Sequence, residues 1–288
     1  MFLDTPGLAV VETVEEGLDA KLRRPGSVFV AGGTEVVADQ NLELREPAPY
    51  VSLRRIAELQ HIDIRADRVT IGGGIVVARL LDEPLKSAAP LLAKAARAFG
   101  TRQVRNRATV GGNIASGLPD RTLLPCLLVL DAEVELRSPS ATRRLALDVF
   151  LKDGGRTALT DEELLTHVTI KPVAGYQDYV MVGPRNAQFY PTVSVALVAD
   201  EKKRTIRLGL GNAGPKAMRA GEAEAFANQS ISWDRREASP QVAQEFGSIA
   251  AEHCAPVSDA TAGADYRRHA VKVMARRLLS RIFEDQPS

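Results

Sequence analysis

The sequence contains little cysteine, almost no net charge and no long hydrophobic run. Its only cysteines, Cys126 and Cys254, are far apart and in no metal-ligand spacing. A disulfide framework, a zinc site and an iron–sulfur cluster carried by this chain alone are therefore not expected. The formal net charge is +1, whereas proteins that bind nucleic acid or anionic membranes usually carry a basic excess. We expect small molecules or other proteins as partners.

Membrane segments and the common catalytic sets are also missing from the sequence. No apolar stretch approaches the roughly 18 residues that a membrane helix needs, and the first seven residues lack the basic and apolar regions of a secretion signal. We therefore expect a soluble cytoplasmic protein. No Ser-His-Asp or Cys-His set is recognisable, so we predict no catalytic residue and no metal ligand among the scattered histidines, His61, His167, His253 and His269.

Glycine-rich turns are the most informative feature that is present. Ala31-Gly-Gly-Thr34 follows an apolar run, and a second Gly-Gly pair lies inside Arg105-Asn-Arg-Ala-Thr-Val-Gly-Gly-Asn-Ile-Ala115. A third candidate is Gly72-Gly-Gly74. Glycine lets the backbone turn sharply and brings N–H groups close to an anion. One Gly-Gly turn is usually only a turn, but two with flanking Thr and Asn favour a long phosphorylated ligand held from both sides.

The first part of the chain shows a mixture of helical and strand patterns. A length of 288 residues fits one large or two medium domains. The patterns predict a helix over 14–24, strands over 27–30 and 50–53, and a hairpin of 61–65 and 68–71. They also predict helical segments over 78–99 broken at Pro84 and Pro90, a strand over 131–136 with one solvent-exposed face, and a closing strand over 164–170.

The pattern changes after 171–175, which combines Pro and Gly and resembles a linker. Period-two alternation predicts an antiparallel hairpin of 192–198 and 205–210, followed by helices over 220–227, 240–254 and 265–283. The last helix carries many basic residues, and either a solvated face or an acidic partner subunit explains them. These residues are Arg267, Arg268, Lys272, Arg276, Arg277 and Arg281.

Several motifs in order carry a family resemblance. They are Ala31–Thr34, Ile71–Gly74, Arg105–Ala115, Leu130–Ala132, Val182–Asn186 and Asp265–Arg268. Together they resemble the FAD-binding medium subunit of the molybdenum hydroxylases, a family that includes xanthine dehydrogenase and carbon monoxide dehydrogenase. The resemblance covers nearly the whole chain, and its most specific part is Thr-Val-Gly-Gly-Asn-Ile.

The resemblance implies an α+β fold in two domains. The first is a two-part FAD-binding domain of the vanillyl-alcohol-oxidase (PCMH) type over 1–172, with lobes of about 1–55 and 56–172. The second, over 176–288, is a small domain with an antiparallel sheet and helices, of the carbon monoxide dehydrogenase flavoprotein type.

The resemblance also implies a function and partners. Such a subunit takes electrons from the 2Fe-2S clusters of a small partner subunit and passes them through FAD to NAD or another acceptor, while a molybdopterin-binding large subunit oxidises the substrate. The implied assembly is a dimer of heterotrimers. Two alternatives stay open: a stand-alone FAD-dependent oxidoreductase, and a non-enzymatic assembly subunit that has lost FAD. Oxygen and quinone stay open as acceptors beside NAD.

Cofactor-binding residues follow from the resemblance position by position. The hydroxyl and amide of the second turn are expected to bind phosphate oxygens, and Phe189 and Tyr190 could stack on the flavin ring or pack between domains. The assigned residues are Val30, Ala31, Gly32, Gly33, Thr34 and Glu35 of the first turn, Thr109, Gly111, Gly112, Asn113 and Ala115 of the second, and Phe99, Thr122, Leu164 and Met181 elsewhere.

Two of these positions depart from the family pattern. Thr122 stands where the family commonly has Asp, so a neutral hydroxyl replaces a carboxylate, although Asp120 is only two residues away. Met181 stands where several members have Lys. A lysine would favour negative charge on the reduced flavin, so we expect Met181 to make the flavin harder to reduce unless Arg185 compensates.

Overall fold

The N-terminal lobe is a parallel three-stranded sheet with two helices. The computed structural model describes residues 7–184 and 190–284. The strands lie in the order β1-β3-β2, and Thr13 caps α1 by accepting a hydrogen bond from Glu16 N at 3.1 Å. The elements are β1 (Leu8–Val10), α1 (Val14–Arg23), β2 (Val28–Val30), α2 (Val36–Asn41) and β3 (Tyr50–Ser52).

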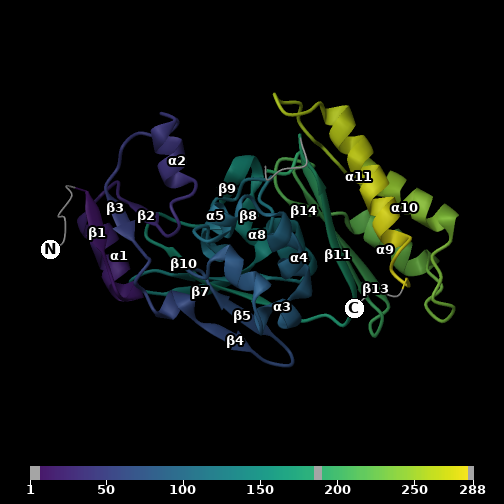
Figure 1. Cartoon of the computed structure of the whole chain (residues 1–288), viewed down its shortest axis with the longest axis horizontal. Coiled ribbons are helices and arrows are strands. Elements are labelled where there is room, and N and C mark those ends of the chain that lie inside the picture. Colours follow the sequence, from purple (N-terminus) through teal and green to yellow (C-terminus); the bar gives the residue numbers. More distant parts are fainter. Residues whose placement is uncertain (1–6, 185–189, 285–288) are drawn as a thin grey trace.

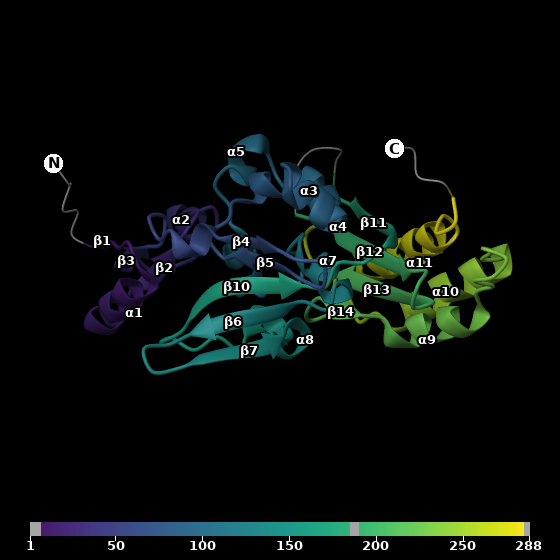
Figure 2. The ribbon, with the colours of Figure 1, turned by 90° about the horizontal axis from the view of Figure 1, so that it is seen from below.

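A larger antiparallel sheet follows, in the order β4-β5-β10-β6-β7. Its central strand comes last in the chain, so the closing strand of the sequence analysis lies in the middle of the sheet (Figure 2). The predicted hairpin of 61–71 is confirmed as β4 and β5. The strands are β4 (Ile62–Ile64), β5 (Val69–Gly72), β6 (Glu133–Arg137), β7 (Thr142–Ala146) and β10 (Leu164–Ile170).

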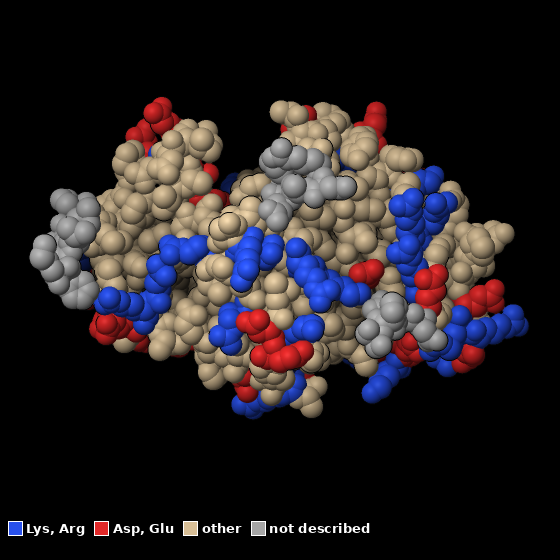
Figure 3. Space-filling model, viewed as in Figure 1, with Lys and Arg blue, Asp and Glu red and all other residues tan. Residues whose placement is uncertain are grey.

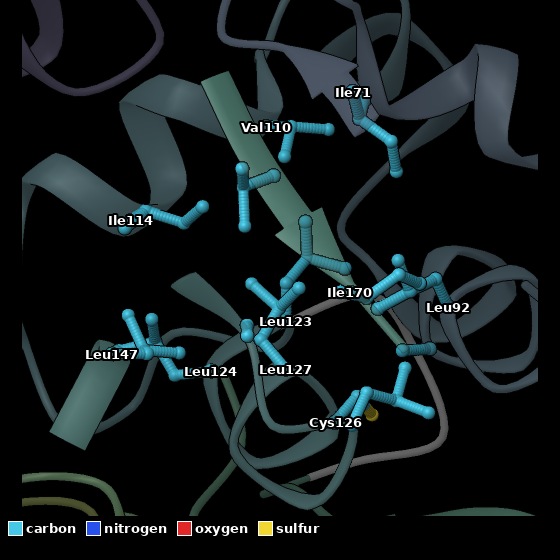
Figure 4. Packing of buried hydrophobic residues seen from close by; sticks show 14 of the residues in the cluster. Ile71, Leu92, Val110, Ile114, Leu123, Leu124, Cys126, Leu127, Leu147 and Ile170 are labelled. Atoms are coloured by element: carbon cyan, nitrogen blue, oxygen red, sulfur yellow. The ribbon is translucent and has the colours of Figure 1, made fainter. Parts of the chain in front are cut away.

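Short helices cover this sheet and build the main core. The helical pattern of 78–99 is interrupted at Pro84 and Pro90, as predicted. Side chains of α6, α7 and α8 meet those of β5 and β10 in a packed apolar centre (Figure 4). The helices are η1 (Glu58–Gln60), η2 (Val77–Leu81), α3 (Leu85–Ala88), α4 (Pro90–Ala98), α5 (Arg102–Arg105), α6 (Val110–Ala115), α7 (Leu124–Val129), α8 (Leu147–Phe150) and η3 (Asp153–Gly155), and a small antiparallel pair is formed by β8 (Leu151–Lys152) and β9 (Arg156–Thr157).

The C-terminal part is a four-stranded antiparallel sheet with three helices on one face (Figure 1). The predicted hairpin is confirmed as β12 and β13, and the three predicted helices are confirmed as α9 to α11. The elements are β11 (Gly175–Val182), β12 (Val193–Asp200), β13 (Thr205–Gly211), β14 (Met218–Arg219), α9 (Gly221–Ser230), α10 (Pro240–Glu252) and α11 (Ala264–Leu279).

Strand β12 is buried on both faces because the two parts of the chain share its sheet. Ala196 and Val198 belong to the core that contains α7, whereas Val195 and Leu197 belong to the core beneath α9 to α11. An ionic contact crosses the same boundary, since Asp131, which follows α7, pairs with Arg207 at 2.6 Å and with Arg219 at 3.1 Å. The two parts therefore pack as one body.

The basic helix differs from the expectation of a uniformly solvated face. Arg267 on α11 is only 2% exposed. Its guanidinium donates to Asp259 Oδ2 at 2.7 Å and to Thr261 Oγ1 at 2.8 Å, in the loop before the helix. Including Arg267 in a solvated or partner-binding face was therefore wrong, because the preceding loop folds back to satisfy its charge.

Candidate functional site

A cleft of about 630 Å³ lies between the N-terminal lobe and the rest of the molecule. Figure 3 shows the surface hollowed beside the part that carries α2. The volume is in the range of small-molecule and cofactor sites. Every residue assigned to cofactor binding except Met181 lies in its wall: Val30, Ala31, Gly32, Gly33, Thr34, Glu35, Phe99, Thr109, Gly111, Gly112, Asn113, Ala115, Thr122 and Leu164.

The first glycine loop, residues 31–35, joins β2 to α2. Gly33 has a φ of +73°, which favours glycine, and a Cβ at Gly32 would lie 2.0 Å from Arg107 O. The backbone N–H groups of Gly32, Gly33 and Thr34 have no acceptor within 7–184 and 190–284. Because they line the cleft, the first loop offers unused donors to an anion.

The second glycine loop, residues 109–113, uses its donors differently. Gly111 N donates to Gly73 O at 2.9 Å, and Gly112 N donates to Thr109 Oγ1 at 3.1 Å. A Cβ at Gly111 would lie 2.6 Å from Gly73 O. Gly111 thus serves the close approach to Gly73, and the third glycine turn, Gly72–Gly74, has a packing role at that contact.

Polar side chains of the second loop remain available to a ligand. Asn113 Oδ1 accepts from Leu123 N at 3.3 Å, and its amide nitrogen has no acceptor in the described part of the chain. The Thr109 hydroxyl accepts from Gly112 N and can still donate its own proton. The expected hydrogen bonds from these two side chains to phosphate oxygens remain a prediction.

Apolar residues form other parts of the wall. Phe99 follows α4 and is 8% exposed, and Leu164 begins β10 and is 5% exposed. Tyr190 also lines the cleft and is 54% exposed. Phe189 and Arg185, which the sequence analysis named as a stacking residue and as a compensating charge, lie outside the described residues.

Met181 lies apart from this wall. It is on β11, its Sδ is 3.7 Å from Tyr179 Oη, and it packs against the core shared with α7. Thr122, by contrast, is in the wall and is 4% exposed. The assignment of Met181 rested on alignment with the family's lysine alone, and a strand residue that packs inward does not reach the cleft in this structure.

Arg121 is the site residue that the sequence analysis missed. Its side chain is 5% exposed and lines the cleft. It forms an ion pair with Glu35 at 2.8 Å, and its Nε donates to Ser116 Oγ at 2.7 Å. Its guanidinium also lies 4.6 Å from the ring centroid of Tyr190. The available signal was a charged pair, Asp120-Arg121, inside an otherwise apolar segment.

Other ionisable groups near the cleft have shifted pKa values. Burial raises the pKa of Asp120 above its ordinary value, although Arg121 opposes the shift. Hydrogen bonds from Arg143 lower the pKa of Glu163, which lines the cleft. No group of His, Cys, Asp and Glu in the described ranges could hold a metal ion. No described helix is long and apolar enough to cross a membrane.

Comparison with known families identifies the class of protein. The model for the FAD binding domain in molybdopterin dehydrogenase matches residues 6–173, and the model for the CO dehydrogenase flavoprotein C-terminal domain matches residues 178–282. The chain therefore belongs to the family of FAD-binding subunits of molybdopterin dehydrogenases. The predicted FAD cofactor and the interpretation as a flavoprotein oxidoreductase subunit are confirmed at this level.

Individual relatives agree with this assignment over nearly their whole length. The chain is 27% identical to the nicotine 6-hydroxylase medium subunit of Paenarthrobacter nicotinovorans, covering 93% of each. It is 28% identical to the carbon monoxide dehydrogenase medium chain of Hydrogenophaga pseudoflava, covering 95% of this chain and 93% of the relative.

The fold agrees as well. A solved structure of carbon monoxide dehydrogenase from Hydrogenophaga pseudoflava superposes with a TM-score of 0.89 at 26% identity, covering 98% of this chain and 99% of that one. The predicted α+β, two-domain FAD-binding fold is confirmed.

Proposed function

We propose that this chain receives electrons from the 2Fe-2S clusters of a partner subunit and passes them through FAD in the described cleft to NAD or another acceptor. The observation that carries the proposal is the first glycine loop, whose residues with unused N–H groups line the same cleft of cofactor size as the polar side chains of the second loop. FAD, when bound, supplies the ability to accept single electrons and release a pair.

The residues of the chain have separate tasks in this proposal. The first loop donates backbone hydrogen bonds to the pyrophosphate, and Thr109 and Asn113 add side-chain donors. Phe99 and Leu164 exclude water from the apolar parts of the cofactor. The chain itself contributes no acid–base residue to substrate oxidation, which belongs to a molybdopterin-binding large subunit in this proposal.

The proposal includes the assembly and the domain limits. We infer a dimer of heterotrimers in the cytoplasm, with the large molybdopterin subunit and the small 2Fe-2S subunit as partners. The medium chains of Hydrogenophaga pseudoflava and Paenarthrobacter nicotinovorans support a multi-subunit enzyme. Domain limits of 1–172 and 176–288 are supported by the coil that precedes β11.

The visible absorbance spectrum tests the proposal. The chain is purified alone and after co-expression with its neighbouring genes, and released cofactor is identified by chromatography. We expect stoichiometric FAD that is bleached by substrate only in the co-expressed complex. A colourless complex that still oxidises substrate would contradict the electron-transfer role and favour an assembly subunit, whereas bleaching of the isolated chain by an organic substrate would favour a stand-alone oxidoreductase.

A further inference from the structure

Arg121 is a buried cation in the wall of the cofactor cleft. Among the described residues of the wall the other cationic side chains are those of Lys21 and Arg45. Arg45 is exposed, and the ammonium of Lys21 donates to Ser27 O. A charge in a partly desolvated cleft acts on a neighbouring group more strongly than the same charge in water. Arg121 is therefore the cation best placed to influence a bound cofactor.

The position of Arg121 is fixed from three separate segments. Glu35 belongs to the first glycine loop, Ser116 follows α6, and Tyr190 precedes β12. Holding a long side chain from three sides removes most of its rotational freedom. These contacts hold the guanidinium in one position, and a preorganised charge acts on a bound group without the cost of reorganisation.

Two carboxylates, those of Glu35 and Asp120, lie beside Arg121. Arg121 also contacts Asp120 at 3.2 Å, but Asp120 is not part of the cleft wall. Burial raises the pKa of Asp120, and Arg121 opposes this shift. Glu35 is thus the carboxylate of the cleft wall that pairs with Arg121.

We propose that Arg121 is a charge-supplying positioning residue that makes the flavin in this cleft easier to reduce, with Glu35 holding it in place. The inference rests on the proposed FAD site. Reduction adds electrons to the flavin, and a nearby positive charge stabilises the more negative state.

A purely structural role makes a different prediction. If Arg121 only ties the first loop to the segment after α6, then breaking the ion pair from either side weakens the binding of oxidised and reduced FAD alike. The flavin midpoint potential would then not move. If the charge matters, R121Q and E35Q break the same contact but shift the potential in opposite directions.

The experiment is a redox titration of the flavin in the purified full-length protein, with its FAD content measured in parallel. We expect R121Q to lose about tenfold in its preference for reduced over oxidised FAD, a potential lower by about 30 mV for a two-electron couple. E35Q should raise the potential, and R121K should restore most of the wild-type value. R137Q is the matched control, because Arg137 bridges Glu15 and Glu58 away from the cleft.

Failure of the proposed function and failure of the role of Arg121 give different results. Wild-type protein and its complex without FAD would contradict the proposed function itself. FAD-loaded R121Q and E35Q with an unchanged potential, or with shifts of the same sign, would overturn only the role of Arg121. If R121Q loses FAD altogether, the flavin potential of E35Q is the deciding measurement. A raised potential supports the role of Arg121, and an unchanged potential overturns it.

Discussion

The two glycine loops look alike in the sequence and differ in what their backbone does. In the first loop, the N–H groups of Gly32, Gly33 and Thr34 have no acceptor among the described residues. In the second, Gly111 and Gly112 donate to Gly73 O and Thr109 Oγ1. The same Gly-Gly signature thus leaves backbone donors for a ligand in one loop and uses them for the fold in the other.

The difference teaches that a glycine pair alone does not define an anion site. The close approach of two backbones also demands glycine, as Gly73 and Gly111 show. Substitution of Gly33 should therefore weaken FAD binding more than folding, whereas substitution of Gly32 or Gly111, which both approach other backbone closely, should also weaken the fold. The predictions below test this contrast in decreasing order of expected effect.

The largest effect is expected from G32A. Its Cβ would lie 2.0 Å from Arg107 O, which is backbone and cannot rotate away. We expect the free energy of unfolding to fall by about 3 kcal/mol, the upper end of typical overpacking costs, and FAD to be lost. Urea unfolding of the apoprotein and the FAD content after gel filtration measure the two effects. Normal FAD content would contradict the close packing of this loop.

The next effect is expected from G111A in the second loop. Its Cβ would lie 2.6 Å from Gly73 O, so the contact between two glycine turns must open. We expect the apoprotein to lose about 2 kcal/mol of stability. Urea unfolding without FAD is the measurement, with G221A as a control, because a Cβ there meets nothing within 4 Å and the backbone is not left-handed. A loss no larger than that of G221A would refute the packing role.

G33A should affect binding more than folding. Gly33 has a φ of +73°, and its Cβ would meet the movable side chain of Val37 at 3.2 Å. Left-handed backbone costs a residue with a Cβ about 1–2 kcal/mol, so the loop should move and misdirect its N–H groups. We expect FAD affinity, measured by fluorescence titration, to fall about tenfold or more. Unchanged affinity would show that these donors do not hold the cofactor.

T109V should have a smaller effect than G33A, and it should lower stability more than FAD affinity. The hydroxyl of Thr109 caps α6 at Gly112 N, and removing an N-cap typically costs about 1 kcal/mol. We expect a corresponding decrease in apoprotein stability by urea unfolding, and a smaller loss of FAD affinity than in G33A. If T109V lowers FAD affinity more than G33A does, the division of tasks between the loops is wrong.

The smallest effect is expected at the native cysteines. Burial raises the pKa of Cys254 to about 12 and that of Cys126 well above its ordinary value, so both thiols carry almost no thiolate near pH 8. Iodoacetamide should leave the folded protein unlabelled and label both cysteines in urea. Mass spectrometry measures this. If the native cysteines are not labelled in the folded protein, labelling of the variant T34C can show whether FAD shields the first loop. Labelling of folded wild-type protein would contradict the burial of the two cysteines.

Regular elements with an apolar face could be predicted from the sequence. The hairpin of β12 and β13 and the helices α9 to α11 appear where the patterns place them. Strand β7 was not predicted, because its sequence Thr-Arg-Arg-Leu-Ala is mostly exposed and has no apolar alternation. Strand β11 was not predicted either, because the sequence analysis assigned no element between the linker at 171–175 and the hairpin that begins at 192.

The cleft could be anticipated through the family motifs, but its charges could not. Arg121 and Arg267 are both buried arginines whose partners come from distant segments or from a folded-back loop. Burial of a charge depends on tertiary contacts that periodicity does not encode. Met181 was placed by alignment, and only the orientation of β11 shows that it packs elsewhere.

The sheet that contains β12 has a consequence for how this protein can be divided. Ala196 and Val198 complete the core around α7, and Asp131 is neutralised by arginines on β13 and β14. A fragment that ends before β11 would uncover apolar surface and leave a carboxylate without its counterions. The flavin-binding part is therefore not expected to fold without the C-terminal part, and the two parts should unfold in one cooperative transition.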